Sequence, residues 1–181
     1  MSLAKIGVTV GGDIETRDLP LLDLGNYLAG DDSGKEELAE ELRFASETVG
    51  FLALKNHGIP QSLLDRAIDE NTRFCNLPLE EKLKIQVDQN QRGYIQPKAT
   101  LIKHSIYHDN TKFDLNETTV FATDFAPDNP HVIAGKQFYA LNQWPENLPG
   151  FRETVEEYMS AMQVLGKKLL PLWALSLELP E

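Results

Sequence analysis

The sequence predicts a helix-rich α+β fold, with four helices and only four or five short strands. Two observations on the 181-residue chain support this prediction. Apolar residues recur at spacings of three and four over long stretches, which is typical of amphipathic helices, whereas the apolar and β-branched runs that suit strands are short. Because the apolar helix faces need a surface to pack against, we expect the helices to cover a small sheet.

Residues 1–17 are expected to form a loose N-terminal arm, because they are polar and contain glycines; a strand at 6–10 is the alternative for part of this segment. The ordered chain is expected to begin at residue 18. Residues 19–24 have the sequence Leu-Pro-Leu-Leu-Asp-Leu and predict a short buried strand that stops at Gly25.

The first long helix is predicted over residues 34–49. Ser33 and Glu36 have the spacing of a capping box, in which each side chain bonds a backbone N–H at the helix start. The helix is expected to end at Gly50. Its apolar stripe consists of Leu38, Leu42, Ala45 and Val49.

A second strand and two further helices follow. Residues 51–54 are a continuous apolar run, which predicts a strand buried on both faces. Pro60 suits the first turn of the next helix, and Pro78 that of a third, short helix through residues 80–83. The stripe of the helix after Pro60 consists of Leu63, Leu64, Ala67, Ile68, Phe74 and Cys75.

The middle of the chain is expected to be mostly irregular. Residues 86–110 are polar and contain breakers, with a brief strand at 94–95, and the β-branched and aromatic residues 118–121 predict another strand. Four prolines between residues 124 and 150 indicate an irregular crossing loop.

The last element is a long helix over about residues 151–177. Pro171 is expected to kink it, and Gly166 would let a neighbouring segment approach closely. Its predicted stripe is Val155, Tyr158, Met159, Met162, Leu165, Leu169 and Trp173.

The amino-acid composition excludes some classes of binding partner. Seventeen Lys and Arg residues against 28 Asp and Glu give a formal net charge of −11. Such a surface repels phosphate backbones and anionic headgroups, so neither nucleic acid nor a membrane surface is expected as a partner. The single cysteine, Cys75, cannot form an internal disulfide, which favours a reducing, cytoplasmic location. The apolar segments are too short for a signal peptide or a membrane span.

Taken in order, several segments resemble the N-terminal part of the isopenicillin N synthase-like family of non-haem Fe(II)/2-oxoglutarate-dependent dioxygenases. The resemblance covers residues 18–181 and implies the helix-rich N-terminal half of a double-stranded β-helix (jelly-roll) oxygenase. The matching residues are 19–24, 50–59 (Gly-Phe-Leu-Ala-Leu-Lys-Asn-His-Gly-Ile), 74–78 with Glu81 and Lys82, Arg92-Gly93-Tyr94, 114–117, 142–145, 151–152, Tyr158 and 177–181.

The resemblance implies that the intact enzyme binds Fe(II) and 2-oxoglutarate, activates dioxygen, and hydroxylates, desaturates or cyclises a small organic substrate. Family members hold iron with His-X-Asp or His-X-Glu and a distant second His. Here the residues two positions after the four histidines are Ile59, Ile106, Asn110 and Ile133, and no Arg-X-Ser clamp for 2-oxoglutarate occurs. We therefore expect the catalytic jelly-roll half to follow residue 181, and residues 1–181 alone to be inactive.

Arg92 and Tyr94 are the candidate substrate-binding residues. In the resembling enzymes this segment leads into a strand that lines the mouth of the active site, where Arg92 could pair with a substrate carboxylate. The alternative is a turn glycine, Gly93, flanked by an exposed Arg and a packed Tyr.

Other chemistry-bearing residues favour structural interpretations. His57 follows a strand in a turn, where a ring bonded to nearby backbone is favoured over a metal ligand. His104 and His108 could bind a divalent ion with neighbouring aspartates if their segment were helical, but a solvated loop is favoured.

Glu117 and Asp114 could act as an acid–base pair, but a salt bridge or strand-end cap is favoured, and Cys75 is interpreted as a small hydrophobic residue. Two alternatives to the oxygenase remain. One is a non-catalytic interaction module that retains only the helical half of the fold, and the other is a small metal-binding protein.

Overall fold

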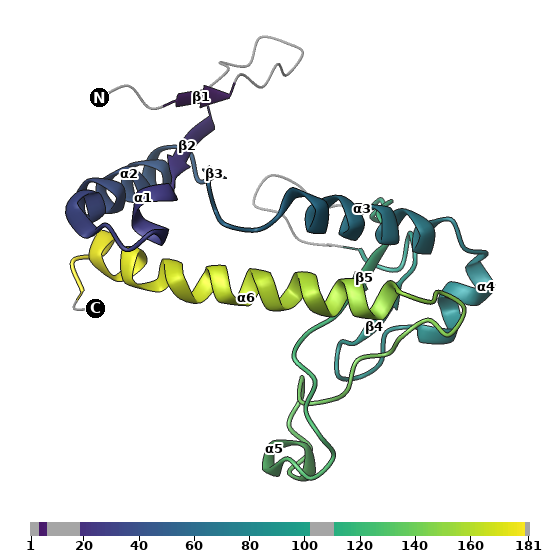
Figure 1. The fold of residues 1–181 in the computed structure, drawn as a ribbon. Helices are drawn as coiled ribbons and strands as arrows, with labels where there is room; N and C mark the ends of the chain where they lie inside the picture. The colour runs from purple at the N-terminus through teal and green to yellow at the C-terminus, as the bar shows by residue number, and fades with distance from the viewer. Residues whose placement is uncertain (1–3, 7–18, 102–110, 180–181) are drawn as a thin grey trace. The chain divides into compact units, whose positions relative to one another are not determined.

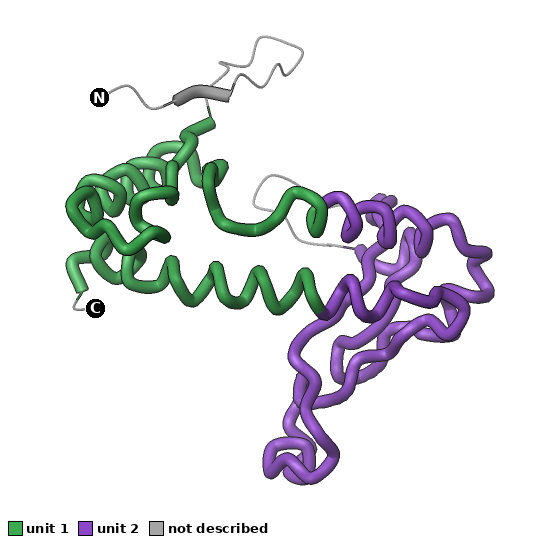
Figure 2. Tube along the Cα trace, in the orientation of Figure 1, with its two compact units in different colours: residues 1–64, 157–181 green, residues 65–156 purple. Residues whose placement is uncertain are grey.

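The computed structural model describes residues 4–6, 19–101 and 111–179. These form two compact units, unit 1 with residues 1–64 and 157–181 and unit 2 with residues 65–156 (Figure 2). The elements in chain order (Figure 1) are β1 (Ala4–Ile6), β2 (Leu19–Asp23), α1 (Gly25–Leu28), a 3₁₀ turn (Asp32–Gly34), α2 (Lys35–Thr48), β3 (Ala53–Lys55), α3 (Gln61–Cys75), α4 (Leu79–Lys82), a 3₁₀ turn (Leu83–Ile85), β4 (Gly93–Ile95), β5 (Thr118–Val120), α5 (Pro130–Ile133) and α6 (Phe151–Ser176).

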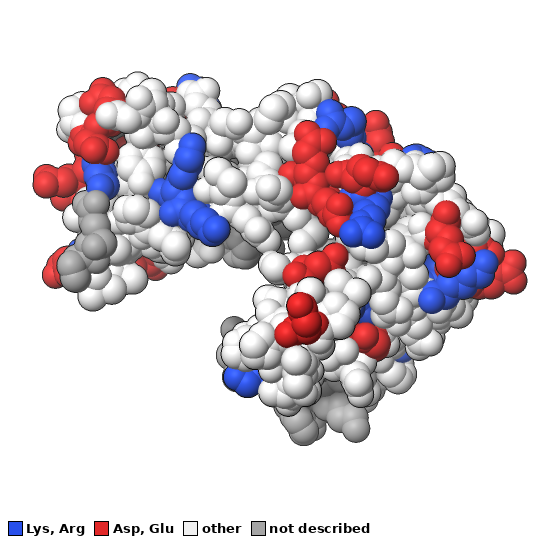
Figure 3. All heavy atoms as spheres, turned by 60° about the horizontal axis from the view of Figure 1, so that its bottom comes forward, with Lys and Arg blue, Asp and Glu red and all other residues white. Residues whose placement is uncertain are grey.

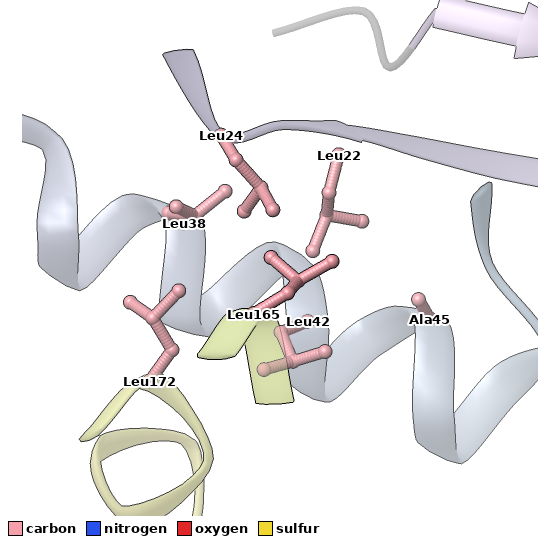
Figure 4. Close-up of a cluster of buried hydrophobic side chains, with 7 residues drawn as sticks. All are labelled: Leu22, Leu24, Leu38, Leu42, Ala45, Leu165 and Leu172. Atoms are coloured by element: carbon pink, nitrogen blue, oxygen red, sulfur yellow. The ribbon is translucent and has the colours of Figure 1, made fainter. Parts of the chain in front are cut away.

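Unit 1 contains a three-stranded sheet with β2 in the centre. β1 pairs with it antiparallel and β3 pairs parallel, with Leu22 opposite Leu54. One face of this sheet and the facing sides of two helices form the core of the unit (Figure 4). The buried residues are Leu22 and Leu24, then Leu38, Leu42 and Ala45 of α2, and Leu165 and Leu172 of α6.

The predictions for the strand at residues 19–24 and for the helix after Gly34 are confirmed, but two details are wrong. The residue at the start of α2 is Gly34, which makes no side-chain cap; instead the Asp31 carboxylate accepts a bond from the Ser33 backbone N–H in the preceding 3₁₀ turn. The run 51–54 is not buried on both faces, since Phe51 is 76% exposed and lies before an outer strand of the sheet.

Unit 2 is built on the two-stranded antiparallel sheet of β4 and β5, with Tyr94 opposite Thr119. Both strands were predicted, and the helix α4 after Pro78 is confirmed. The crossing loop contains the one-turn helix α5, which begins where the Asn129 side chain accepts a bond from the His131 N–H. The buried apolar core of unit 2 consists of Phe74, Ile85, Tyr94, Leu148 and Phe151.

Helix α6 confirms the long final helix, which continues through Pro171. Its buried stripe differs from the predicted one after Leu169: Leu172 is fully buried, whereas Trp173 is 38% exposed. Leu170 and Leu177 are exposed on the same side as Trp173. The helix therefore has one apolar side in the core of unit 1 and an adjoining apolar side, formed by Leu170, Trp173 and Leu177, that is exposed; we call it the open side of α6.

The described helices include none with the length and hydropathy needed to cross a bilayer. On the face drawn in Figure 3, basic side chains lie in small separate groups, several of them beside acidic ones. This distribution differs from the continuous basic stripe that nucleic-acid binding uses.

Candidate functional site

The candidate site lies around β4 in unit 2, where Gly93 brings two backbone segments into close contact. Gly93 has a φ of 115°, and a Cβ atom placed on it would lie 2.3 Å from the Ile85 carbonyl oxygen and 2.9 Å from Nε2 of Gln143. That Nε2 atom donates to the carbonyl oxygens of Gln86 (3.0 Å) and Arg92 (2.7 Å). Glycine is therefore required here for both the backbone conformation and the space.

Arg92 is buried, with 3% of its surface exposed. Its Nη2 donates to the Phe138 carbonyl oxygen at 2.6 Å and its Nη1 to the Asn90 carbonyl oxygen at 3.3 Å, while Nε has no hydrogen-bond partner. Among the described residues no carboxylate forms an ion pair with the guanidinium group. The alternative of an exposed arginine is therefore wrong, and its role as a substrate contact remains a prediction.

Tyr94 is also buried, with 1% of its surface exposed. Its ring meets Phe74 edge-on at 5.7 Å between centroids, and its hydroxyl donates to Oε2 of Glu117 at 2.6 Å. The ring thus belongs to the apolar core of unit 2 while the hydroxyl ends in a polar cluster.

That polar cluster is completed by Lys82. Its Nζ atom lies 2.7 Å from Oε2 of Glu117, donates to the Cys75 carbonyl oxygen at 3.0 Å, and lies 5.4 Å from the Tyr94 ring centroid. We call these three side chains the Lys82–Glu117–Tyr94 network. It joins α4, β4 and the chain just before β5, and it confirms the predicted salt bridge of Glu117.

The electrostatics of the network keep Glu117 ionised. Hydrogen bonds from Lys82 and Tyr94 hold the pKa of the Glu117 carboxyl below its ordinary value, although burial acts in the opposite direction. Burial lowers the pKa of Lys82, but the hydrogen bonds and negative charges of Glu117 and Tyr94 together outweigh it, so the net shift of this pKa is upward. Burial raises the pKa of Cys75 and of Tyr94. At neutral pH the network is therefore a fixed ion pair and not a proton donor, and the Cys75 thiol stays protonated.

His57 has the structural role predicted for it. Its Nδ1 accepts a bond from the Ile59 backbone N–H at 3.1 Å. In unit 1 its ring lines an open groove of about 580 Å³ together with Ile59, Pro60, Ala161 and Val164.

The described residues do not fit a metal site. Within the described ranges, no three or more His, Cys, Asp and Glu side chains are grouped so that they could hold a metal ion. His104, His108 and their neighbour Asp109 lie outside the described residues. We therefore assign no iron ligand to the described part of this chain.

Comparison with known proteins decides the family. Residues 19–147, well over half of the chain, match the family model described as "non-haem dioxygenase in morphine synthesis N-terminal". The chain belongs to this family. The resemblance inferred from the sequence motifs is therefore confirmed.

Curated relatives match along nearly the whole chain. The 2-oxoglutarate-Fe(II) type oxidoreductase hxnY of Emericella nidulans is 34% identical over 167 residues, which cover 90% of this chain and 46% of the relative. Azadirone synthase LFS of Melia azedarach is 32% identical over 174 residues, covering 94% of this chain and 48% of the relative. The chain thus spans about half the length of these relatives.

Solved structures show the same fold. A 2OG-Fe(II) oxygenase family protein of Caulobacter crescentus superposes with a TM-score of 0.69 at 26% identity, covering 89% of this chain and 49% of that chain. A full-length Neurospora crassa protein, solved in complex with alpha-KG, superposes with a TM-score of 0.73 at 23% identity, covering 98% of this chain and 51% of that chain.

Sequence reasoning missed three residues that build the site. Lys82 and Gln143 lie in segments that carry the family resemblance, but the sequence did not predict which groups they bond. Phe138 carries no sequence signal, because its role depends on a carbonyl group that meets Arg92 across 46 positions of the chain.

Proposed function

We propose that this chain is the N-terminal part of an Fe(II)/2-oxoglutarate-dependent oxygenase that hydroxylates, desaturates or cyclises a small organic substrate with dioxygen. The observation that carries the proposal is the family match over residues 19–147. It is supported by relatives whose names are those of 2-oxoglutarate-Fe(II) oxidoreductases and dioxygenases. These names favour an enzyme over a non-catalytic interaction module.

In the whole protein, iron and 2-oxoglutarate would supply the oxidising chemistry, and their ligands would come from a jelly-roll half. Two observations support this division. The chain spans about half the length of its relatives, and its described residues offer no metal-binding group. We expect the native reading frame to continue beyond Glu181 for about the length of this chain, because the relatives are about twice as long.

Within that enzyme, the role proposed for α6 is to support the jelly roll. The open side of the helix carries Leu170 and Leu177, which are 63% and 60% exposed, and Trp173. Gly166 lies on the same side, one turn before Leu170, with no atom near the position of a Cβ. Exposed apolar residues in such a row favour burial against another part of the protein.

Arg92 and Tyr94 remain the proposed substrate-side residues. Both side chains are buried within unit 2, and the guanidinium group is covered by the segment that contains Phe138. A direct contact between Arg92 and a substrate therefore requires that segment to move. Tyr94 would act indirectly, by holding β4 to Glu117.

The test uses the protein expressed from its full native reading frame. Fe(II) and 2-oxoglutarate together should raise its melting temperature, because ligands that bind only the folded state stabilise it. Succinate formation and oxygen uptake are then measured over a panel of small organic compounds, with samples lacking Fe(II) or 2-oxoglutarate as controls. A native stop codon directly after Glu181, or neither stabilisation nor succinate from the longer protein, would overturn the proposal.

A further inference from the structure

Residues 122–142 form an excursion from unit 2 that we call the flap. Figure 1 shows α5 at its tip, away from β4 and β5. The Asn142 side chain joins the two ends of the flap: its Oδ1 accepts from the Ala122 N–H at 2.9 Å, and its Nδ2 donates to the Ala122 carbonyl oxygen at 2.6 Å. The Asn142 backbone N–H also donates to the Asp124 carboxylate. These bonds form a clasp at the base of the flap.

The flap has packing of its own. The Tyr139 ring lies 4.6 Å from the ring centroids of both Phe125 and His131, and the Phe125 N–H donates to the Ala140 carbonyl oxygen at 3.2 Å. No residue of the flap, which is described throughout, is buried or belongs to the apolar core of unit 2. The flap can therefore change position without disturbing that core.

One strong contact ties the flap, five residues after the end of α5, to the turn before β4. The Arg92 guanidinium donates to the Phe138 carbonyl oxygen at 2.6 Å, which is a short, charge-assisted bond. The neighbouring bond from Nε2 of Gln137 to the Gln89 carbonyl oxygen is 3.5 Å long and correspondingly weak.

The residue bound by Arg92, Phe138, has an unfavourable backbone conformation. Its φ is 71°, in the left-handed region that a bulky residue rarely adopts. Phe138 is 53% exposed, so packing of its side chain gives little compensation. Strain of this kind persists only where the surroundings impose it. Here the surroundings are the turn over residues 136–139, in which the Tyr139 N–H donates to the Lys136 carbonyl oxygen at 3.4 Å, and the buried arginine that binds the Phe138 carbonyl oxygen.

Arg92 itself is incompletely satisfied in this state. Its acceptors are neutral carbonyl groups and its Nε has no partner. A buried guanidinium group without a counter-ion gains free energy when it is exposed to water or to an anion. Both sides of the contact therefore carry a cost that opening would relieve.

We infer that Arg92 is a latch that holds the flap closed, and that the flap opens as a unit about the Asn142 clasp, exposing the guanidinium group. This device would control whether Arg92 can reach a substrate, but it does not depend on the proposed oxygenase function.

The test measures the position of the flap by electron–electron distance spectroscopy in the protein expressed from its native reading frame. Nitroxide spin labels are attached at the exposed positions Glu80 and Ile133 in a Cys75→Ala background. The distance between the two labels reports the position of the flap. Arg92→Lys and Arg92→Met should each raise the ratio of open to closed populations by about 10- to 100-fold, as expected for loss of a charge-assisted bond.

Matched controls keep the result specific. Two control variants should leave the closed distance dominant. Gln137→Ala removes only the weak neighbouring bond, and Phe138→Gly removes the backbone strain but keeps the carbonyl group that Arg92 binds. A second label pair at Glu80 and Glu153 lies outside the flap and should not change. The inference is overturned if the flap distance is unchanged in both Arg92 variants, or if those variants disturb the second pair equally.

Discussion

Substitution of Gly93 by alanine should destabilise unit 2 more than the same substitution at a glycine with free space around it. The new methyl group would lie 2.3 Å from the Ile85 carbonyl oxygen, which is backbone and cannot rotate away, and 2.9 Å from Nε2 of Gln143. The Gln143 side chain would have to leave, and its bonds to the Gln86 and Arg92 carbonyl oxygens would be lost.

The size of the effect follows from these contacts. Alanine at a φ of 115° costs about 1–3 kcal/mol in backbone strain. Each hydrogen bond of Gln143 contributes about 0.5–1.5 kcal/mol. We therefore expect the free energy of unfolding to fall by roughly 2–6 kcal/mol, a large part of the 5–15 kcal/mol typical of a domain.

Urea unfolding followed by tryptophan fluorescence measures this change. The chain has two tryptophans, and a Trp173→Phe background leaves Trp144, whose ring stacks on Phe121 at 4.6 Å, as the reporter of unit 2. Gly135→Ala is the matched control, because Gly135 also has a positive φ, 63°, but no atom within 4 Å of a Cβ position. It should cost only about 1–2 kcal/mol.

The two variants together isolate the close approach of the backbone. If Gly93→Ala and Gly135→Ala lower the free energy of unfolding equally, the contact with Ile85 does not constrain residue 93. A Gly93→Ala protein without a cooperative transition, beside a normal Gly135→Ala protein, would agree with the expected loss.

Three further outcomes are expected. Glu117→Gln should lower the free energy of unfolding by about 1.5–3 kcal/mol, the usual contribution of a hydrogen bond between charged groups, because Lys82 would remain buried without its counter-charge. The pKa of Glu117 in the folded state lies below its ordinary value of 4.5. The ionised carboxylate therefore stabilises the wild-type protein fully at pH values above 4.5, and this stabilisation is lost as the pH falls through the folded-state pKa. Urea titrations at several acidic pH values should show this loss in the wild-type protein and not in Glu117→Gln. The 181-residue chain alone should associate through the open side of α6, and Leu170→Lys should shift it toward monomer in sedimentation experiments, whereas an unchanged distribution would argue against that surface. The same chain supplied with Fe(II) and 2-oxoglutarate should form no succinate, and measurable turnover would contradict the absence of iron ligands from its described residues.

The family and most of the helices and strands could be predicted from the amino-acid sequence alone. The strand at 19–24, the helices α2, α3 and α6, and the strands β4 and β5 follow from spacing, proline placement and β-branched composition. These are local properties, since a helix or strand depends on which residues recur within a few positions along the chain. The ordered series of motifs, including Arg92-Gly93-Tyr94, was enough to indicate the family.

The surroundings of each side chain, in contrast, could be learned only from the folded chain. The exposure of Phe51 depends on which sheet edge β3 occupies. The burial of Leu172, where Trp173 was predicted to be buried, depends on which side of α6 meets β2 and α2. The partners of Arg92 and Lys82 lie 46 and 35 positions away along the chain. Local periodicity carries no information about such pairs, because their free energy depends on distance and burial in the folded chain and not on separation in the sequence.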